Sequence, residues 1–131
     1  MIGVWAHGAQ AYLLVLASLT TLFFAIPIFF VPLRWSRLML WRTPEDTDLA
    51  VYFGRCLGAY VLIVEFLMFR AGLYGTGLHF TFEILMMAWC LMIAVHVWGA
   101  LKSIQPVTET VEIGFWVLLI GLTLAFWPAA A

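Results

Sequence analysis

Charged residues are scarce in this chain, and their scarcity excludes most soluble folds. Lysine, arginine, aspartate and glutamate together make up 10% of the 131 residues, whereas soluble domains contain about 25%. Hydrophobic residues make up 66%, and the mean hydropathy is +1.08. A soluble core of this size cannot bury so much apolar surface, but a lipid bilayer accommodates it. We therefore expect an integral membrane protein.

Motifs for catalysis and for nucleic-acid binding are also missing. The sequence contains no GxSxG, HExxH, Walker or glycine-rich dinucleotide motif. Its net charge of −1, without a basic run, excludes nucleic acid as a partner. Cys56 and Cys90 lie in apolar segments and form no CxxC pair, so we expect buried small hydrophobic side chains and not a thiol oxidase. We assign no catalytic residue and favour a protein that is not an enzyme.

Long apolar stretches are what the sequence does contain. Four of them predict transmembrane helices over about residues 10–31, 44–70, 79–102 and 107–127, because about 20 apolar residues cross the hydrocarbon. Pro27 and Pro32 predict a kink and a stop at the end of the first span. Thr43 as N-cap and Pro44 at the first helical position predict the start of the second. We expect one all-α domain over residues 1–131, an antiparallel up-down bundle of four helices.

Basic residues predict the orientation of the bundle. The first loop, with an interfacial segment at 33–42, holds Arg34, Arg37 and Arg42, and the third loop holds Lys102. The positive-inside rule places these loops in the cytoplasm and both termini on the outer, periplasmic side. Residues 1–10 carry no lysine or arginine, so we expect a retained first span and not a cleaved signal peptide. The small size and absence of targeting signals favour a bacterial inner membrane.

Polar residues inside the second and third spans predict an outer polar layer. In two antiparallel helices joined by a short turn, residues whose numbers sum to about 149 lie at similar depth. This places Glu65 level with Glu83, with Arg70 and His79 about one turn further out and His7 within reach. Structural pairing, proton or ligand handling, and metal binding are the alternatives for this layer. His79 precedes Glu83 by four residues, unlike the Glu-x-x-His of di-iron bundles, so we assign no metal ligand.

A second, inner polar layer is predicted from the same arithmetic. Arg55 lies level with His96, and Glu112 enters the fourth helix at comparable depth. One interpretation is an Arg55–Glu112 ion pair that joins the second helix to the fourth. The alternative is that Arg55 and His96 donate hydrogen bonds to a quinone carbonyl or a lipid phosphate. Trp89 shares a helical stripe with His96 and predicts an aromatic wall beside the imidazole. The cofactor is left unknown, with quinone or lipid as candidates and metal disfavoured.

Small residues on the second helix predict a close helix contact. Gly54 and Gly58 form a small-xxx-small face, which lets a neighbouring helix approach closely. The neighbour is either a helix of this chain or a second copy.

The segment around these glycines resembles a known family. Residues 53–60, Phe-Gly-Arg-Cys-Leu-Gly-Ala-Tyr, follow a first span ending in Pro27 and Pro32, and this arrangement resembles the DoxX-like group of small bacterial membrane proteins. The resemblance implies a four-helix fold and, for some members, association with membrane redox complexes such as thiosulfate–quinone oxidoreductase. Arg55 and its neighbouring glycines match, whereas Glu65 and Glu83 have no counterpart in the pattern.

The sequence thus predicts a small non-catalytic subunit of a larger membrane complex, respiratory or otherwise redox-active. Minimal mass outside the bilayer and a small-residue helix face favour this function. Its expected partners are other membrane subunits or copies of itself, and lipids. The alternative is a stand-alone protein that binds a quinone, lipid or ion, with a quinone-linked oxidoreductase as its catalytic form.

Overall fold

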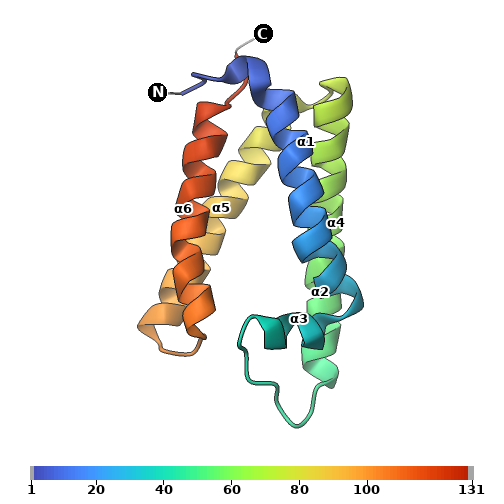
Figure 1. Cartoon of the computed structure of the whole chain (residues 1–131), viewed down its shortest axis with the longest axis vertical. Coiled ribbons are helices and arrows are strands. Elements are labelled where there is room, and N and C mark those ends of the chain that lie inside the picture. Colours follow the sequence, from blue (N-terminus) through green and yellow to red (C-terminus); the bar gives the residue numbers. More distant parts are fainter. Residues whose placement is uncertain (1, 130–131) are drawn as a thin grey trace.

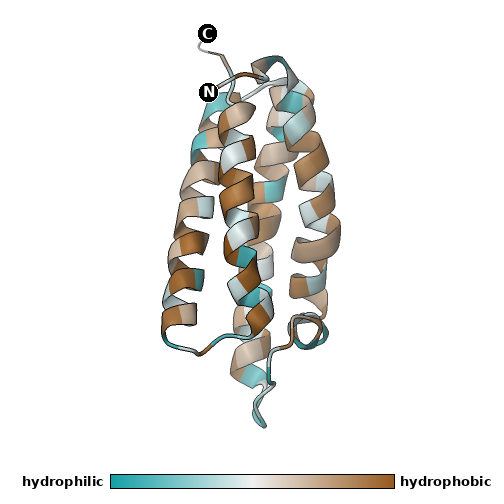
Figure 2. Cartoon of the chain, turned by 60° about the vertical axis from the view of Figure 1, so that its left-hand side comes forward, coloured by the Kyte–Doolittle hydropathy of each residue, from teal (hydrophilic) through white to brown (hydrophobic). Residues whose placement is uncertain are grey.

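Helices dominate the computed structural model, which describes residues 2–129. Four of them are long and apolar enough to cross a membrane: Ala6–Phe30, Asp48–Tyr74, Leu78–Leu101 and Val107–Ala125. Hydrophobic residues occupy most of their length, whereas the connection that follows α3 is mostly hydrophilic (Figure 2). The predicted all-α membrane protein with four long apolar helices is confirmed.

The first span is irregular near its middle. It comprises a 3₁₀ turn at Ala6–Gly8, α1 at Ala9–Thr20, a π-helical turn at Thr21–Ala25 and α2 at Ile26–Phe30. Pro27 has no amide hydrogen, and its ring excludes the carbonyl one turn earlier from a normal helical position. The wider turn before Pro27 accommodates that carbonyl. The proline therefore alters the span one turn ahead of its own position.

The connection between the first and second spans is longer than expected. Helix α3 covers Pro32–Leu38, and α4 covers Asp48–Tyr74 with Thr47 as N-cap. The predicted helix start at Thr43 and Pro44 is therefore wrong. Proline is compatible with a first helical position, but the Asp46 carboxylate accepts a 3.1 Å hydrogen bond from the Asp48 amide. This local turn begins the helix four residues later.

Two glycines make the tight turn between the second and third spans. Gly75 and Gly77 adopt φ values of 71° and 73°, in the left-handed region that glycine enters without steric cost. Helix α5 then begins directly and covers Leu78–Leu101, and α6 covers Val107–Ala125. The short turn forces α4 and α5 to run in opposite directions.

The spans form two pairs, with α1 and α2 against α4, and α5 against α6 (Figure 1). A methyl group added at Gly54 would lie 2.6 Å from Cβ of Pro32, and one at Gly58 would lie 2.6 Å from the backbone nitrogen of Phe29. The small-residue face of α4 is therefore filled by α2 and α3 of the same chain. This result settles which neighbour the two glycines admit.

The two pairs are packed together mainly in the half of the bundle that holds the chain termini, here called the termini end. The Gly3 and Trp5 amides donate to the carbonyls of Leu124 and Ala125 at 2.9 and 2.8 Å. The buried apolar cluster lies in this half and comprises Ala9, Leu13, Leu16, Ala17, Met68, Ala71, Phe82, Leu85, Trp89, Trp116 and Leu119. Towards the opposite end, here called the α3 end, α5 leans away from α4 (Figure 1).

A buried hydroxyl also joins the two pairs. Thr123 on α6 is fully buried, and its Oγ1 accepts a 3.0 Å hydrogen bond from Nε1 of Trp89. The Tyr12 hydroxyl on α1 lies 2.9 Å from the same atom. Buried indole and phenol groups need such partners, because an unpaired polar group in a water-poor site is costly. One threonine thereby links α1, α5 and α6.

Candidate functional site

The most concentrated polar chemistry lies between α5 and α6, near the α3 end. His96 on α5 is 4% exposed, although it is one of few ionisable groups in the span. It continues the buried face of α5, which includes Phe82, Leu85 and Trp89, because these positions recur at helical spacing. The imidazole therefore points at α6 and away from lipid.

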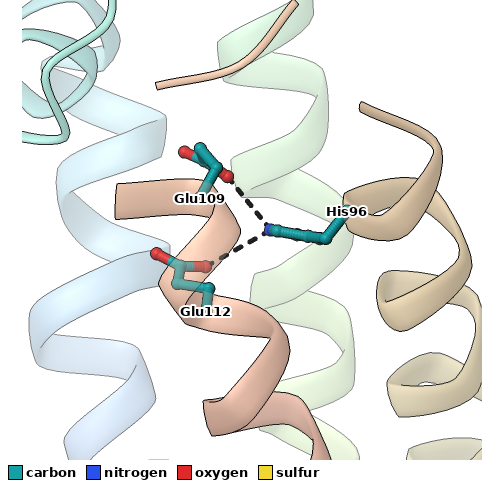
Figure 3. Close-up of side chains that lie close together, drawn as sticks. All are labelled: His96, Glu109 and Glu112. Atoms are coloured by element: carbon teal, nitrogen blue, oxygen red, sulfur yellow. Dashed lines mark ion pairs between the residues drawn. The ribbon is translucent and has the colours of Figure 1, made fainter. Parts of the chain in front are cut away.

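Two glutamates on α6 converge on this imidazole. His96 Nε2 lies 3.0 Å from Oε2 of Glu109 and 3.4 Å from Oε2 of Glu112. The two glutamates are three residues apart, so they share a face of α6, and Figure 3 shows both carboxylates turned towards the histidine. Their side chains are only 12% and 14% exposed. The three residues therefore form a compact, largely enclosed cluster.

Hydrogen bonds fix the orientation of the imidazole. Nδ1 of His96 lies 2.7 Å from the carbonyl oxygen of Met92, and a carbonyl only accepts, so Nδ1 carries a hydrogen. Nε1 of Trp116 donates towards Nε2 over 3.4 Å. An indole N–H aims favourably at a lone pair, not at another N–H. These contacts orient the ring so that Nε2 faces the two carboxylates.

The loop after α3 closes over the cluster. Nε1 of Trp41 donates a 2.7 Å hydrogen bond to Oε1 of Glu109, and the Thr108 hydroxyl donates to the carbonyl of Met39. Between them, Leu40 adopts a φ of 64°, a conformation that costs about 1–2 kcal/mol in a residue with a side chain. The contacts with α6 offset this strain and hold Trp41 against the acid.

The structure brings only part of the predicted inner layer together. His96 and Glu112 meet, whereas Arg55 is exposed. Ion pairs within residues 2–129 involve His96 with Glu109 and Glu112, so the predicted Arg55–Glu112 pair is wrong. Equal depth does not imply proximity here, because α5 leans away from α4 towards the α3 end (Figure 1).

The aromatic wall beside the imidazole is formed differently from the prediction. The ring of Trp116, on α6, lies 5.8 Å from that of His96, and Trp89 packs on Trp116 with ring centroids 5.4 Å apart. Trp89 therefore supports the ring that contacts the imidazole. The facing helix supplies the nearer tryptophan.

The predicted outer layer does not assemble as a cluster. Glu65 is 4% exposed, whereas Glu83, Arg70 and His7 are exposed. His79 instead contacts the carbonyl oxygen of Ala129 through Nε2 at 2.9 Å. The prediction used depth alone, and Glu83 follows the buried Phe82 by one residue, about 100° away around the helix. The expected meeting of Glu65 with Glu83 is therefore wrong.

Glu65 occupies a separate enclosed position beside the π-helical turn. Thr20 and Thr21 lie next to its carboxyl group, yet its Oε2 and the Thr21 hydroxyl have no hydrogen-bond partner among residues 2–129. The Thr20 hydroxyl donates to the Leu16 carbonyl at 2.8 Å. This acid is therefore buried alone and not in a pair.

Two features were missed or misjudged from the sequence. Glu109 was not singled out, although its spacing of three residues from Glu112 and its place in the first turn of α6 put both acids beside His96. Cys90 was expected to be buried but is exposed. An apolar side chain in a membrane span gains nothing from facing inwards, because lipid tails are equally apolar.

Comparison with protein-family models, with curated proteins and with solved structures finds no match for this chain.

Proposed function

We propose that this chain is a small non-catalytic subunit of a larger membrane assembly. The observation that carries the proposal is the exposed carboxylate of Glu83 on the outer surface of α5. A helix of 24 residues is about 36 Å long, against about 30 Å of hydrocarbon. A centred α5 therefore carries Glu83 a few Å inside the hydrocarbon, at a depth where a charge facing lipid is costly.

Arg55 gives independent support on α4. Its side chain is also exposed and lies outside the ion pairs of residues 2–129, which involve His96. A long arginine can reach the interface by itself, whereas the shorter Glu83 side chain reaches less far. A neighbouring subunit that offers a hydrogen-bond donor to Glu83 and an acceptor to Arg55 would stabilise both.

The outer face of α6 offers room for such a neighbour. Gly114 and Gly121 are exposed, and a methyl group added at either would contact nothing within 4 Å. Spaced by seven residues, they share one face of the helix, where a second helix can approach closely. In contrast, Gly54 and Gly58 are already covered by this chain. The free glycine face supports association with another protein.

The finer parts of the proposal follow from the sequence. The resemblance of residues 53–60 to DoxX-like proteins favours a respiratory or other redox complex in a bacterial inner membrane. The positive-inside rule places the α3 end, with Arg34, Arg37 and Arg42, in the cytoplasm and the termini end outside. Copies of the same chain are the alternative partner.

Native gel electrophoresis after mild solubilisation tests the proposal, with proteomics of the band that contains the chain. We expect co-migration with larger partners, and loss of that band in Glu83→Gln and Gly114→Leu. Ile63→Leu is the matched control, because Ile63 is exposed on α4 and leucine preserves its apolar character. Migration of the wild-type chain as a monomer, unchanged by these substitutions, would contradict the proposal.

A further inference from the structure

Three donor atoms from two helices converge at the α3 end of the α5–α6 pair. His96 Nε2, a carboxylate oxygen of Glu109 and one of Glu112 all lie within 4.8 Å of one another. Figure 3 shows that the imidazole from α5 points between the two acids of α6. We propose that these three residues bind one divalent transition-metal ion.

The separations fit donors that share one ion. Nitrogen and oxygen ligands lie about 2.0–2.2 Å from Zn²⁺, which places neighbouring donors roughly 2.8–3.6 Å apart in right-angled or tetrahedral arrangements. The two distances from His96 Nε2 are 3.0 and 3.4 Å. The carboxylate oxygens of Glu109 and Glu112 lie within 4.8 Å of each other, and rotation of the glutamate side chains would bring this pair into the same range.

Charge balance also calls for a cation at this point. Glu109 and Glu112 bring two carboxylates into a largely enclosed position, and the ion pairs of residues 2–129 give them no lysine or arginine partner. Like charges at such short range repel unless a positive charge lies between them. A divalent ion would neutralise both carboxylates at once.

A protonated imidazole is the competing source of positive charge, and it explains the contacts less well. Its single Nε2 hydrogen would serve Glu109 at 3.0 Å and leave Glu112 at 3.4 Å poorly bonded. A metal ion uses the Nε2 lone pair and both acids together.

The surroundings resemble the outer shell that metal sites use. A metal-bound histidine usually donates its second ring N–H to a carbonyl or carboxylate, and His96 Nδ1 faces the Met92 carbonyl at 2.7 Å. The Trp41 indole holds the remaining oxygen of Glu109. Both partners orient a ligand without occupying the metal position.

The donor set defines the class of ion. One imidazole and two carboxylates suit Zn²⁺, Mn²⁺ or Fe²⁺, whereas Mg²⁺ and Ca²⁺ prefer oxygen alone and Cu⁺ prefers sulfur. Three protein ligands leave at least one coordination position for water or another small ligand. The ion would tie α6 to α5 at the α3 end, where the apolar cluster of the bundle is absent.

The test is metal binding by the full chain, purified in detergent without a polyhistidine tag. Zn²⁺ is added and removed by gel filtration, and bound metal is measured by mass spectrometry, with Co²⁺ absorption reporting the ligand field. We expect one equivalent in the wild type. Glu112→Gln should lower affinity by more than the roughly 10- to 100-fold that loss of an outer-shell partner causes. Glu109→Gln/Glu112→Gln should bind no metal.

Glu45→Gln is the matched control, because it removes one exposed acid outside the cluster and should retain full binding. Circular dichroism checks that each variant keeps its helices. If the double variant does not fold, Glu112→Gln alone decides the comparison. Wild-type protein that retains no more Zn²⁺ than the glutamine variants would overturn the proposal. That result would leave the subunit function untouched, because native gels measure partner association separately.

Discussion

Gly58 provides the sharpest test of how the first two spans pack. A methyl group at this position would lie 2.6, 2.7 and 2.8 Å from the backbone nitrogen, Cα and Cβ of Phe29. Unbonded carbons are most stable about 3.5–4.0 Å apart, so α2 would have to move by roughly 1 Å. Because the contact is with backbone, no side-chain rotation relieves it. Overpacking of this kind typically costs about 1–3 kcal/mol.

At Gly58 the cost of overpacking opposes the gain in helix propensity that alanine brings. Alanine is favoured over glycine inside a helix by about 0.8–1.0 kcal/mol, and an alanine at Gly114 should gain that amount, since nothing lies within 4 Å. Both variants gain this propensity, so Gly58→Ala should unfold more readily than Gly114→Ala by roughly the 1–3 kcal/mol of overpacking. Thermal and denaturant unfolding of the monomer in detergent measures the difference. Equal stability of the two variants would refute the close α2–α4 contact.

Three further substitutions test individual contacts. Thr123→Val leaves the buried Trp89 indole and Tyr12 hydroxyl without their shared partner, so unfolding in detergent should become easier by about 1–3 kcal/mol. Thr110→Val removes only an exposed hydrogen bond from Gln105 and should change stability little. Glu65→Gln should keep stability within about 1.5 kcal/mol, because it preserves the volume of a side chain that lacks an ionic partner, and a larger loss would reveal a pairing that the structure does not contain. Trp41→Phe removes the donor to Glu109 and should weaken Zn²⁺ binding about 10- to 100-fold; unchanged affinity would show that the indole does not orient the ligand.

Composition was sufficient to predict the class of fold, because spanning a bilayer restricts the chain to few structures. Apolar runs of about 20 residues have no soluble alternative of this size. Helix ends were less predictable. Thr43 and Pro44 predicted a helix start that the structure does not have. The Asp46 side chain bonds to the backbone two residues on, and this local turn competes with an earlier helix start.

Residue numbers predict the relative depth of two side chains on antiparallel helices, but not the direction in which each side chain faces. The sum rule for antiparallel helices places His96 and Arg55 at one level, yet only the tilt of α5 relative to α4 decides whether they meet. That tilt depends on which spans pair, and Gly54 and Gly58 fix this by admitting α2 and α3. Long-range packing of this kind leaves no periodic signal in a single sequence.

The inner cluster was partly predictable for a simpler reason. His96 and Glu112 belong to consecutive helices joined by a five-residue loop, so the chain itself brings them close. Glu109 could have been added from its three-residue spacing alone. The contact of Trp41 with Glu109 could not be predicted from the sequence. Trp41 lies in a loop 68 residues before Glu109 and reaches the site through the left-handed backbone of Leu40.

The stability of the Glu112→Gln variant relative to the wild type distinguishes a bound metal ion from a proton on His96. If a metal ion holds the two acids, the order of the two stabilities should reverse when Zn²⁺ replaces the chelator. Glu109 lies in the first turn of α6, where the helix dipole favours an acid, but Glu112 lies one turn further and gains less. In protein treated with chelator, Glu112→Gln removes repulsion between two carboxylates and should equal or exceed the wild type in stability. With Zn²⁺ at about 100 times its Kd, the wild type should gain about 2.7 kcal/mol, and the variant should gain little. Thermal unfolding of the wild type and the variant, with chelator and with Zn²⁺, measures which of the two is more stable under each condition. The same order under both conditions would mean that His96 holds the two acids with a proton, because a proton is unaffected by chelator or Zn²⁺.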